Sequence, residues 1–165
     1  MSTFALKIDH NIAGIGAAIA AAPGLFLTAT SRELLNGSRR LATRMKRAAP
    51  KFHSELTNAI LPVSIAPLEH HVRAAKGYAS HIEDGTTGGG IAPISTLEQW
   101  IKAKGITPRD PKTTPLQLAF LIQRGIAAHG SKAQPFAKPS LDAEKPLIEA
   151  RFRDRLTEVI RSMRA

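Results

Sequence analysis

The sequence predicts an α+β fold, in which a small, mostly antiparallel sheet of short strands packs against two long helices. Three observations predict it. An amphipathic helical pattern occupies residues 25–49, a second one ends the chain, and β-branched residues interrupted by prolines lie between them. A length of 165 residues indicates one domain. We expect an N-terminal arm over 1–24 and a single domain over 25–165, with a helical insert at about 95–130.

The N-terminal arm carries two short patterns. Residues Phe4 to Asp9 alternate apolar and polar side chains, which is typical of a short strand. Asp9 or Asn11 is then in place to cap a short Ala-rich helix that ends near Pro23.

The helix predicted over 25–49, which Pro50 closes, has the cleanest amphipathic pattern in the chain. At about 100° per residue, one stripe collects apolar side chains: Leu27, Leu34, Leu41, Met45 and Ala48, with Leu35 and Ala42 at its edge. The opposite side collects basic ones: Arg32, Arg39, Arg40, Arg44, Lys46 and Arg47.

In the middle of the chain the helical pattern gives way to β-branched residues, prolines and shorter helices. Over 54–75, Pro62 and Pro67 interrupt β-branched residues, which favours short edge strands or a bulged hairpin. In the insert, Ser95 and Glu98 have capping-box spacing, and Gly105 ends that helix. The next helix begins at Thr114, Pro115 and Gln117 and runs to His129, with Gly130 as its terminator.

The last helix follows an extended, proline-rich segment over 131–140, in which Phe136 is expected to anchor the chain in the core. Pro146 lies too deep for an unbroken helix from Ser140, so we expect a kink there or a true start at Pro146. One face of this helix is apolar: Leu141, Ile148, Phe152, Leu156, Val159 and Met163.

The composition of the chain limits the classes of function that it can have. The net charge of +10 implies attraction to a polyanion or to acidic protein surfaces. The absence of cysteine excludes disulfides, thiolate catalysis and cysteine zinc sites. The stretch 12–27 is mostly Ala and Gly, so we expect no signal peptide and no membrane span.

The segment 77–86, GYASHIEDGT, gathers residues that could serve catalysis or metal binding. His81, Glu83 and Asp84 lack the HExxH spacing, and adjacent carboxylates before a glycine-rich loop commonly cap backbone amides. The neighbours His70 and His71 point to opposite faces of a strand. The run GTTGGG lacks the GxxxxGK[ST] arrangement of a phosphate loop. We therefore expect no enzyme, no catalytic residue, no metal site and no cofactor.

The stretch 39–47, RRLATRMKR, holds five positive charges and no acid. A charge run of this kind is commonly a solvated helix face. Because these charges share one side and add to a global excess, a polyanion-facing role is an equal alternative. Aromatic residues are absent from the run, which disfavours stacking on single strands.

Two separated segments together resemble a known family. Residues 78–86 resemble its Tyr-Ala-x-x-x-Glu-x-Gly-Thr signature, and residues 132–141 resemble its Ala-x-Pro-Phe-x-x-Pro-Ala-Leu signature. The family is the tail-component group of long-tailed bacteriophages, also called tail-completion, neck, tail-terminator or minor tail proteins. Two departures are that KFHSEL follows Pro50 instead of Val-Asp-Thr-Gly, and that Ser140 replaces Ala. The matching residues are Tyr78, Ala79, Glu83, Gly85, Thr86, Pro135, Phe136 and Pro139.

The resemblance implies a non-enzymatic virion protein that forms a ring, hexameric by family analogy, at the head–tail junction. Its partners would be copies of itself, the connector and the tail-tube proteins, with phage DNA nearby in the channel and no membrane, after assembly in the bacterial cytoplasm. Glu83 would satisfy backbone amides or pair with a basic residue of a neighbouring subunit. The loop Thr87, Gly88, Gly89 and Gly90 would contact the next ring, becoming ordered only on assembly.

Two other functions stay open at this point. One is a stand-alone basic protein that binds nucleic acid without sequence preference. The other, weaker, is a metal-dependent hydrolase that uses His81 and Glu83.

Overall fold

The computed structural model of the chain describes residues 3–5, 23–51 and 54–162. Its elements are, in order, β1 (Thr3–Ala5), α2 (Pro23–Ala48), α3 (Glu55–Ala59), β2 (Ile60–Ala66), β3 (Glu69–Ala74), α4 (Ala79–Asp84), α5 (Ile94–Lys104), α6 (Pro115–His129) and α7 (Ala137–Ser162). The α+β class is confirmed, with a long helix in the N-terminal half and another at the C-terminus.

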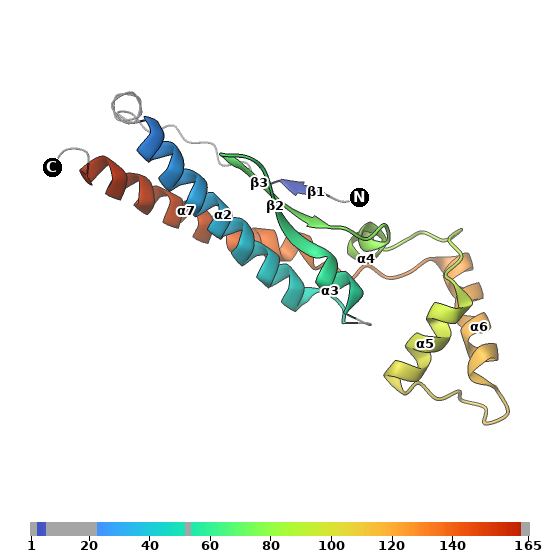
Figure 1. The fold of residues 1–165 in the computed structure, drawn as a ribbon. Coiled ribbons are helices and arrows are strands. Elements are labelled where there is room, and N and C mark those ends of the chain that lie inside the picture. Colours follow the sequence, from blue (N-terminus) through green and yellow to red (C-terminus); the bar gives the residue numbers. More distant parts are fainter. Residues whose placement is uncertain (1–2, 6–22, 52–53, 163–165) are drawn as a thin grey trace.

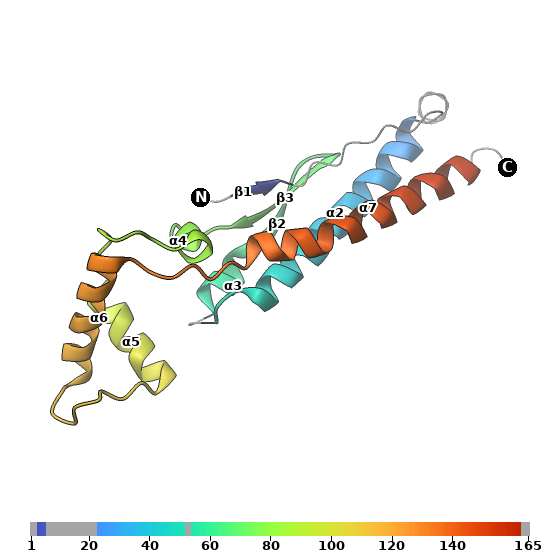
Figure 2. The ribbon, with the colours of Figure 1, turned by 180° about the vertical axis from the view of Figure 1, so that it is seen from behind.

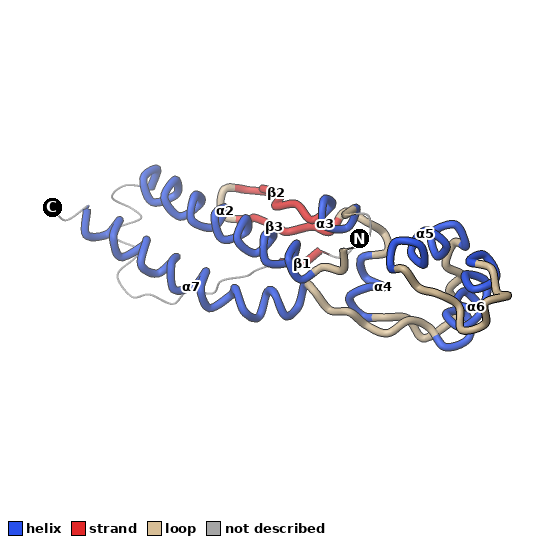
Figure 3. The backbone as a smooth tube through the Cα atoms, turned by 90° about the horizontal axis from the view of Figure 1, so that it is seen from below, coloured by secondary structure: helices blue, strands red, loops and turns tan. Residues whose placement is uncertain are grey.

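The elongated body has three layers, and the long helix α2 is the middle one (Figure 1). The sheet packs on one side of α2, and α7 runs along the other (Figure 3). Helix α7 packs chiefly on α2, and its first residues join the core cluster that also holds residues of the sheet.

Because α2 lies between two layers, it buries more than the single stripe expected from the sequence. Leu41 and Met45 of that stripe are buried, but Leu27 and Ala48 are exposed. Small residues are buried instead where α7 approaches. A Cβ atom on Gly37 would lie 3.0 Å from Cγ2 of Ile148, so the two helices approach too closely for a side chain there. The buried residues of α2 are Ala29, Thr30, Gly37, Ser38, Leu41, Ala42 and Met45.

The sheet is antiparallel, in the order β1-β3-β2. Strand β2 is an edge strand that carries Pro62, and its pairing with β3 shifts register between Ser64 and Ala66. The bulged hairpin with its proline on an edge strand is thus confirmed. Of the predicted strand over residues 4–9, Phe4 and Ala5 lie in β1, whereas residues 6–9 and the expected Ala-rich helix lie outside the described residues.

The core forms where α2, the sheet and the start of α7 meet. Its largest fully buried side chains include Met45, Ile60, Val72, Phe136 and Ile148. Phe136 is 0% exposed, which confirms the expected anchor. In α7 the expected apolar face is also confirmed, since Ile148, Phe152, Leu156 and Val159 are buried and Leu141 packs against the core; Met163 lies outside the described residues.

The helix α7 is continuous through Pro146, so a true start at Pro146 is wrong. The first turns hold because Ala137, Ser140 and Glu144 are buried before the proline is reached. Pro146 itself is exposed, and a proline at such a site removes one backbone hydrogen bond without opening the core.

Two helices, α5 and α6, form a hairpin that projects from one end of the body, and we call residues 91–130 the arm (Figures 1 and 2). The capping box at Thr114 is confirmed, with Pro115 in the first turn. Gly105 ends α5 at a φ of 63°, also as expected. The capping box at Ser95 is wrong, because α5 begins at Ile94 and Glu98 instead pairs with Lys102 at 3.0 Å.

Candidate functional site

The carboxylate of Glu83 binds the first turn of α7. Its Oε2 atom accepts hydrogen bonds from the backbone N–H groups of Phe136 and Ala137, and its Oε1 atom accepts one from Lys138, each at 2.8 Å. Glu83 is only 7% exposed. We call this arrangement the Glu83 clamp.

The clamp supplies hydrogen-bond acceptors to the N-terminus of α7. The first backbone N–H groups of a helix have no partner within it, and a negative charge there is also favoured by the helix dipole. Phe136, the residue before Ala137, has no hydrogen-bond acceptor in its side chain, and Glu83 supplies the cap from α4, more than fifty residues earlier. Of the two roles expected for Glu83, the structure has the one in which it satisfies backbone amides.

Of the other residues in the first signature segment, some are packed in the core and some are exposed. Ala79 is buried, and Ile82 packs against the core. Tyr78 lies in the turn before α4 and is 39% exposed. In the second signature Pro135 and Pro139 are exposed on either side of the buried Phe136.

Tyr78 lies in a small polar group with Glu55 and Lys76. Partial burial, and then the charge of Glu55, raise the pKa of Tyr78 above its ordinary value of 10.0. The Nζ atom of Lys76 donates a hydrogen bond to Oε2 of Glu55 at 3.0 Å, which raises the pKa of Lys76.

Two glycines allow the chain entering the arm to cross the chain leaving it. Thr86 and Ser131 pair through two backbone hydrogen bonds of 3.0 and 3.1 Å. A Cβ on Gly85 would lie 2.6 Å from the Ser131 carbonyl oxygen, and one on Gly130 would lie 1.7 Å from that of Thr86. Both glycines also have positive φ values, 73° and 79°. Gly85 of the first signature is therefore required by a close backbone approach.

The loop Thr87 to Gly90 is more tightly held than the sequence analysis expects. The N–H of Gly89 donates to the Ala127 carbonyl at 2.8 Å, and Gly88 lies against the carbonyls of Ala127 and Ala128. These contacts attach the loop to α6. Thr87 and Gly90 are exposed beside it.

The residues weighed for catalysis or metal binding do not converge. Glu83 is occupied by three amides, whereas His81 and Asp84 are exposed next to it. His71 lies 2.8 Å from Glu69, within its own strand. In the part of the chain that the structure describes, no three His, Asp or Glu side chains group so as to hold a metal ion.

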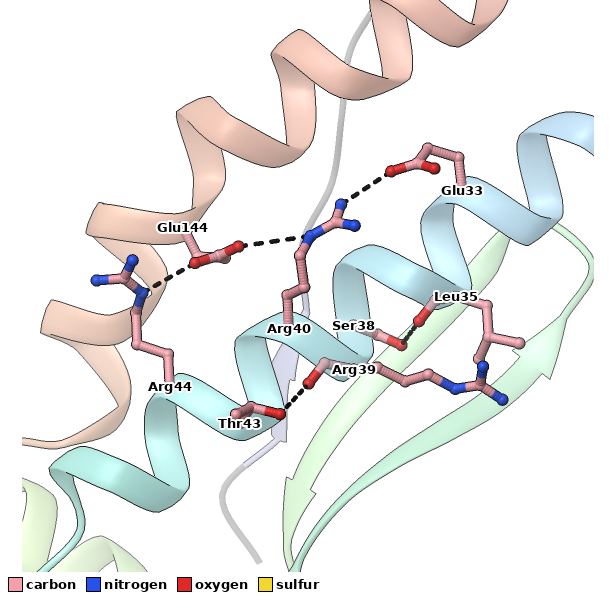
Figure 4. A network of polar contacts seen from close by, with 8 residues as sticks. All are labelled: Glu33, Leu35, Ser38, Arg39, Arg40, Thr43, Arg44 and Glu144. Carbon is pink, nitrogen blue, oxygen red and sulfur yellow. Dashed lines mark hydrogen bonds and ion pairs between the residues drawn. The ribbon is translucent and has the colours of Figure 1, made fainter.

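The basic residues of α2 fall into two sets. Arg40 and Arg44 reach toward α7, whereas Arg39 points away from it (Figure 4). The Nε atom of Arg44 donates to Oε2 of Glu144 at 2.9 Å. Arg40 donates to Glu33 at 2.8 Å, and its Nε lies 3.6 Å from Oε1 of Glu144, beyond hydrogen-bond range.

Of the six basic residues considered for a polyanion-facing role, Arg40 is held by two carboxylates of its own chain. Four others form no ion pair with another described residue: Arg32, Arg39, Lys46 and Arg47. The acid that pairs with Arg44 is Glu144, which is buried in the apolar face of α7, one hundred residues further along the chain, and was not predicted. A glutamate among the apolar positions of α7 does indicate a buried ion pair, because a buried charge needs a partner of opposite charge.

An open groove of about 730 Å³ follows this part of α2. Its lining residues include four arginines and no large apolar or aromatic residue: Arg39, Arg40, Thr43, Arg44, Arg47, Ala48 and Glu144. We call it the arginine groove.

The arm presents an apolar surface that the sequence analysis did not single out. Leu116, Phe120 and Leu121 of α6 are about half exposed, at 55%, 48% and 56%. With Ile94 they line an open hollow of about 650 Å³ beside α6. Within the arm only Ile101 and Ala119 are buried, so the hairpin leaves much of its apolar surface uncovered.

Comparison with known proteins does not place the chain in a family: no family model, no curated protein and no solved structure gives a significant match. None of the helices in the described ranges combines the length and apolar character that a membrane crossing needs.

Proposed function

We propose that this chain is a structural protein of a long-tailed phage virion, which forms a ring at the junction of head and tail. The observation that carries the proposal is the Glu83 clamp. The two segments that resemble the tail-component family lie some fifty residues apart, and the clamp joins the glutamate of the first to the Pro-Phe-x-x-Pro segment of the second.

This contact supports the resemblance in a specific way. Two chance matches would have no reason to touch, whereas here the glutamate of one signature caps the helix that begins within the other. It also gives the glutamate a purely architectural role, because a carboxylate that accepts three amide hydrogen bonds is not available as a base or a metal ligand. A binding or building function is thus favoured over a hydrolase.

The arm supplies a surface for assembly. Apolar residues exposed together commonly mark a protein contact site, and those of α6 lie on a hairpin that projects from the body (Figure 2). A patch at one end of an elongated subunit that binds a different surface of the next copy makes a head-to-tail contact, and such contacts form a ring when the rotation between neighbouring copies closes. In this proposal α6 meets a neighbouring copy, and six copies complete the ring between the connector and the tail tube.

Light scattering and negative-stain microscopy of the purified chain test the proposal. We expect a closed ring at high protein concentration. A variant Leu121→Ser should shift the population toward monomers, because it removes an exposed apolar contact on the arm. The control is Leu147→Ser, which changes a leucine of similar exposure, 47%, on α7.

A chain that stays monomeric at high concentration would contradict the ring. Equal effects of the two leucine changes would contradict the role of the arm.

A further inference from the structure

We propose that the arginine groove binds the phosphodiester backbone of double-stranded nucleic acid. The proposal concerns a surface of the single subunit and holds whether or not the ring forms. It rests on the number of guanidinium groups in the groove, on which of them have free N–H groups, and on a lining without large apolar or aromatic residues.

The charge in the groove is strongly one-sided. Four arginines line it, against the single carboxylate of Glu144. Glu144 is 5% exposed, and through Arg44 it fixes one guanidinium against α7 without covering it. The groove therefore keeps an excess of positive charge after its internal ion pairs are counted.

Three of the four guanidinium groups have N–H groups left for a ligand. Arg39 and Arg47 are exposed and pair with no other described residue. Arg44 uses its Nε atom for Glu144, and its side chain is still 44% exposed, so its two terminal nitrogens remain accessible (Figure 4). Arg40 is held between Glu33 and Glu144 and contributes charge rather than a contact.

The spacing of these residues suits a chain of phosphates. Arg39 and Arg47 are eight positions apart on α2, which is about 12 Å along the helix axis. One strand of DNA carries a phosphate about every 3.4 Å of its axis, so three or four phosphates fall within that length. The planar, forked guanidinium group matches phosphate oxygens through paired hydrogen bonds.

The lining favours nucleic acid over an acidic protein. Centres of protein–protein contacts are rich in aromatic and apolar side chains, whereas this groove offers only Thr43 and Ala48 besides its charged residues. Nucleic-acid contacts are more polar and more positive. With no aromatic side chain and no base-reading arrangement in the groove, binding should be independent of sequence.

The test is fluorescence anisotropy of a labelled DNA duplex of mixed sequence at several salt concentrations. For three phosphate contacts, the logarithm of the binding constant should fall against that of salt with a slope of about −3. The double change Arg39→Gln and Arg47→Gln should weaken binding roughly tenfold and reduce the slope by about 2. Both side chains are exposed, so the fold should persist, as circular dichroism will verify.

The matched control is Arg109→Gln with Arg124→Gln, two exposed arginines of the arm that remove the same charge far from the groove. This pair should change the affinity less than twofold. Equal losses in both pairs would overturn the proposal, because the binding would then follow net charge alone. Binding without a salt slope, or displacement of DNA by polyglutamate at equal charge concentration, would overturn it as well, the latter in favour of an acidic protein partner.

Discussion

Replacing Glu83 by alanine tests the contact on which the architecture of the chain depends. The change removes three hydrogen bonds at once and leaves the backbone N–H groups of Phe136, Ala137 and Lys138 without their acceptor. Two of these bonds are fully buried, and the third is partly buried. The first turn of α7 would lose both its cap and a favourable charge.

The expected cost follows from the two buried donors. A buried donor left without a partner costs about 1–3 kcal/mol, so two of them together destabilise the fold by about 4 kcal/mol. The loss of a carboxylate at the helix N-terminus adds roughly 0.5 kcal/mol. For a domain of this size, that corresponds to a fall in melting temperature on the order of 10 °C.

The assay is thermal and urea unfolding followed by circular dichroism, with Asp84→Ala as the control. Asp84 is the adjacent carboxylate, but it is exposed, so its removal should change the free energy of unfolding by less than about 0.5 kcal/mol. Glu83→Gln should fall between the two, because it keeps one acceptor oxygen and loses the charge. If Glu83→Ala were as stable as Asp84→Ala, the clamp would not hold α7, and the structural support for the family resemblance would be lost.

Two further predictions concern the entry to the arm and the single tyrosine. Gly130→Ala should destabilise the chain and speed hydrogen exchange at Thr86 and Ser131, since its Cβ would overlap the Thr86 carbonyl. Gly125→Ala, in open space within α6, should instead stabilise by about 0.5–1 kcal/mol, and equal exchange in both variants would refute the close approach. Tyr78, the only tyrosine, should form phenolate above pH 10.0 by ultraviolet absorbance. Because the folded pKa is raised, its contribution to stability is complete below pH 10.0 and is lost as the pH rises through the folded pKa. A midpoint at or below 10.0 would contradict the effect of partial burial and of Glu55 on this pKa.

Sequence reasoning succeeded where the cause is local. The capping box at Thr114, the terminator Gly105 and the edge position of Pro62 follow from backbone chemistry within a few residues, and the structure has all three. The prediction that Phe136 lies in the core is also correct, because a large aromatic side chain in an extended, proline-rich segment gains most by burial.

The errors share a different cause, which is contact between distant elements. The pattern of α2 does not reveal that α7 will pack beside it, so the burial of Gly37 and the pairing of Arg44 with Glu144 were missed. Conversely, Ser95 satisfies a local capping rule, yet the cap position of α5 is two residues earlier, at Pro93, and the helix starts at Ile94. In the candidate site, the sequence does not decide between the two roles of Glu83, because its hydrogen-bond partners lie more than fifty residues further along the chain.

The pairing of Thr86 with Ser131 brings the two ends of residues 87–130 to a single point. A segment that departs and returns at one place can be lengthened, shortened or exchanged without pulling on α2, α7 or the sheet. The architecture of the body therefore does not depend on the length or sequence of residues 87–130. Removing 87–130 and joining the flanks by a short turn would leave a minimal subunit that keeps its three layers.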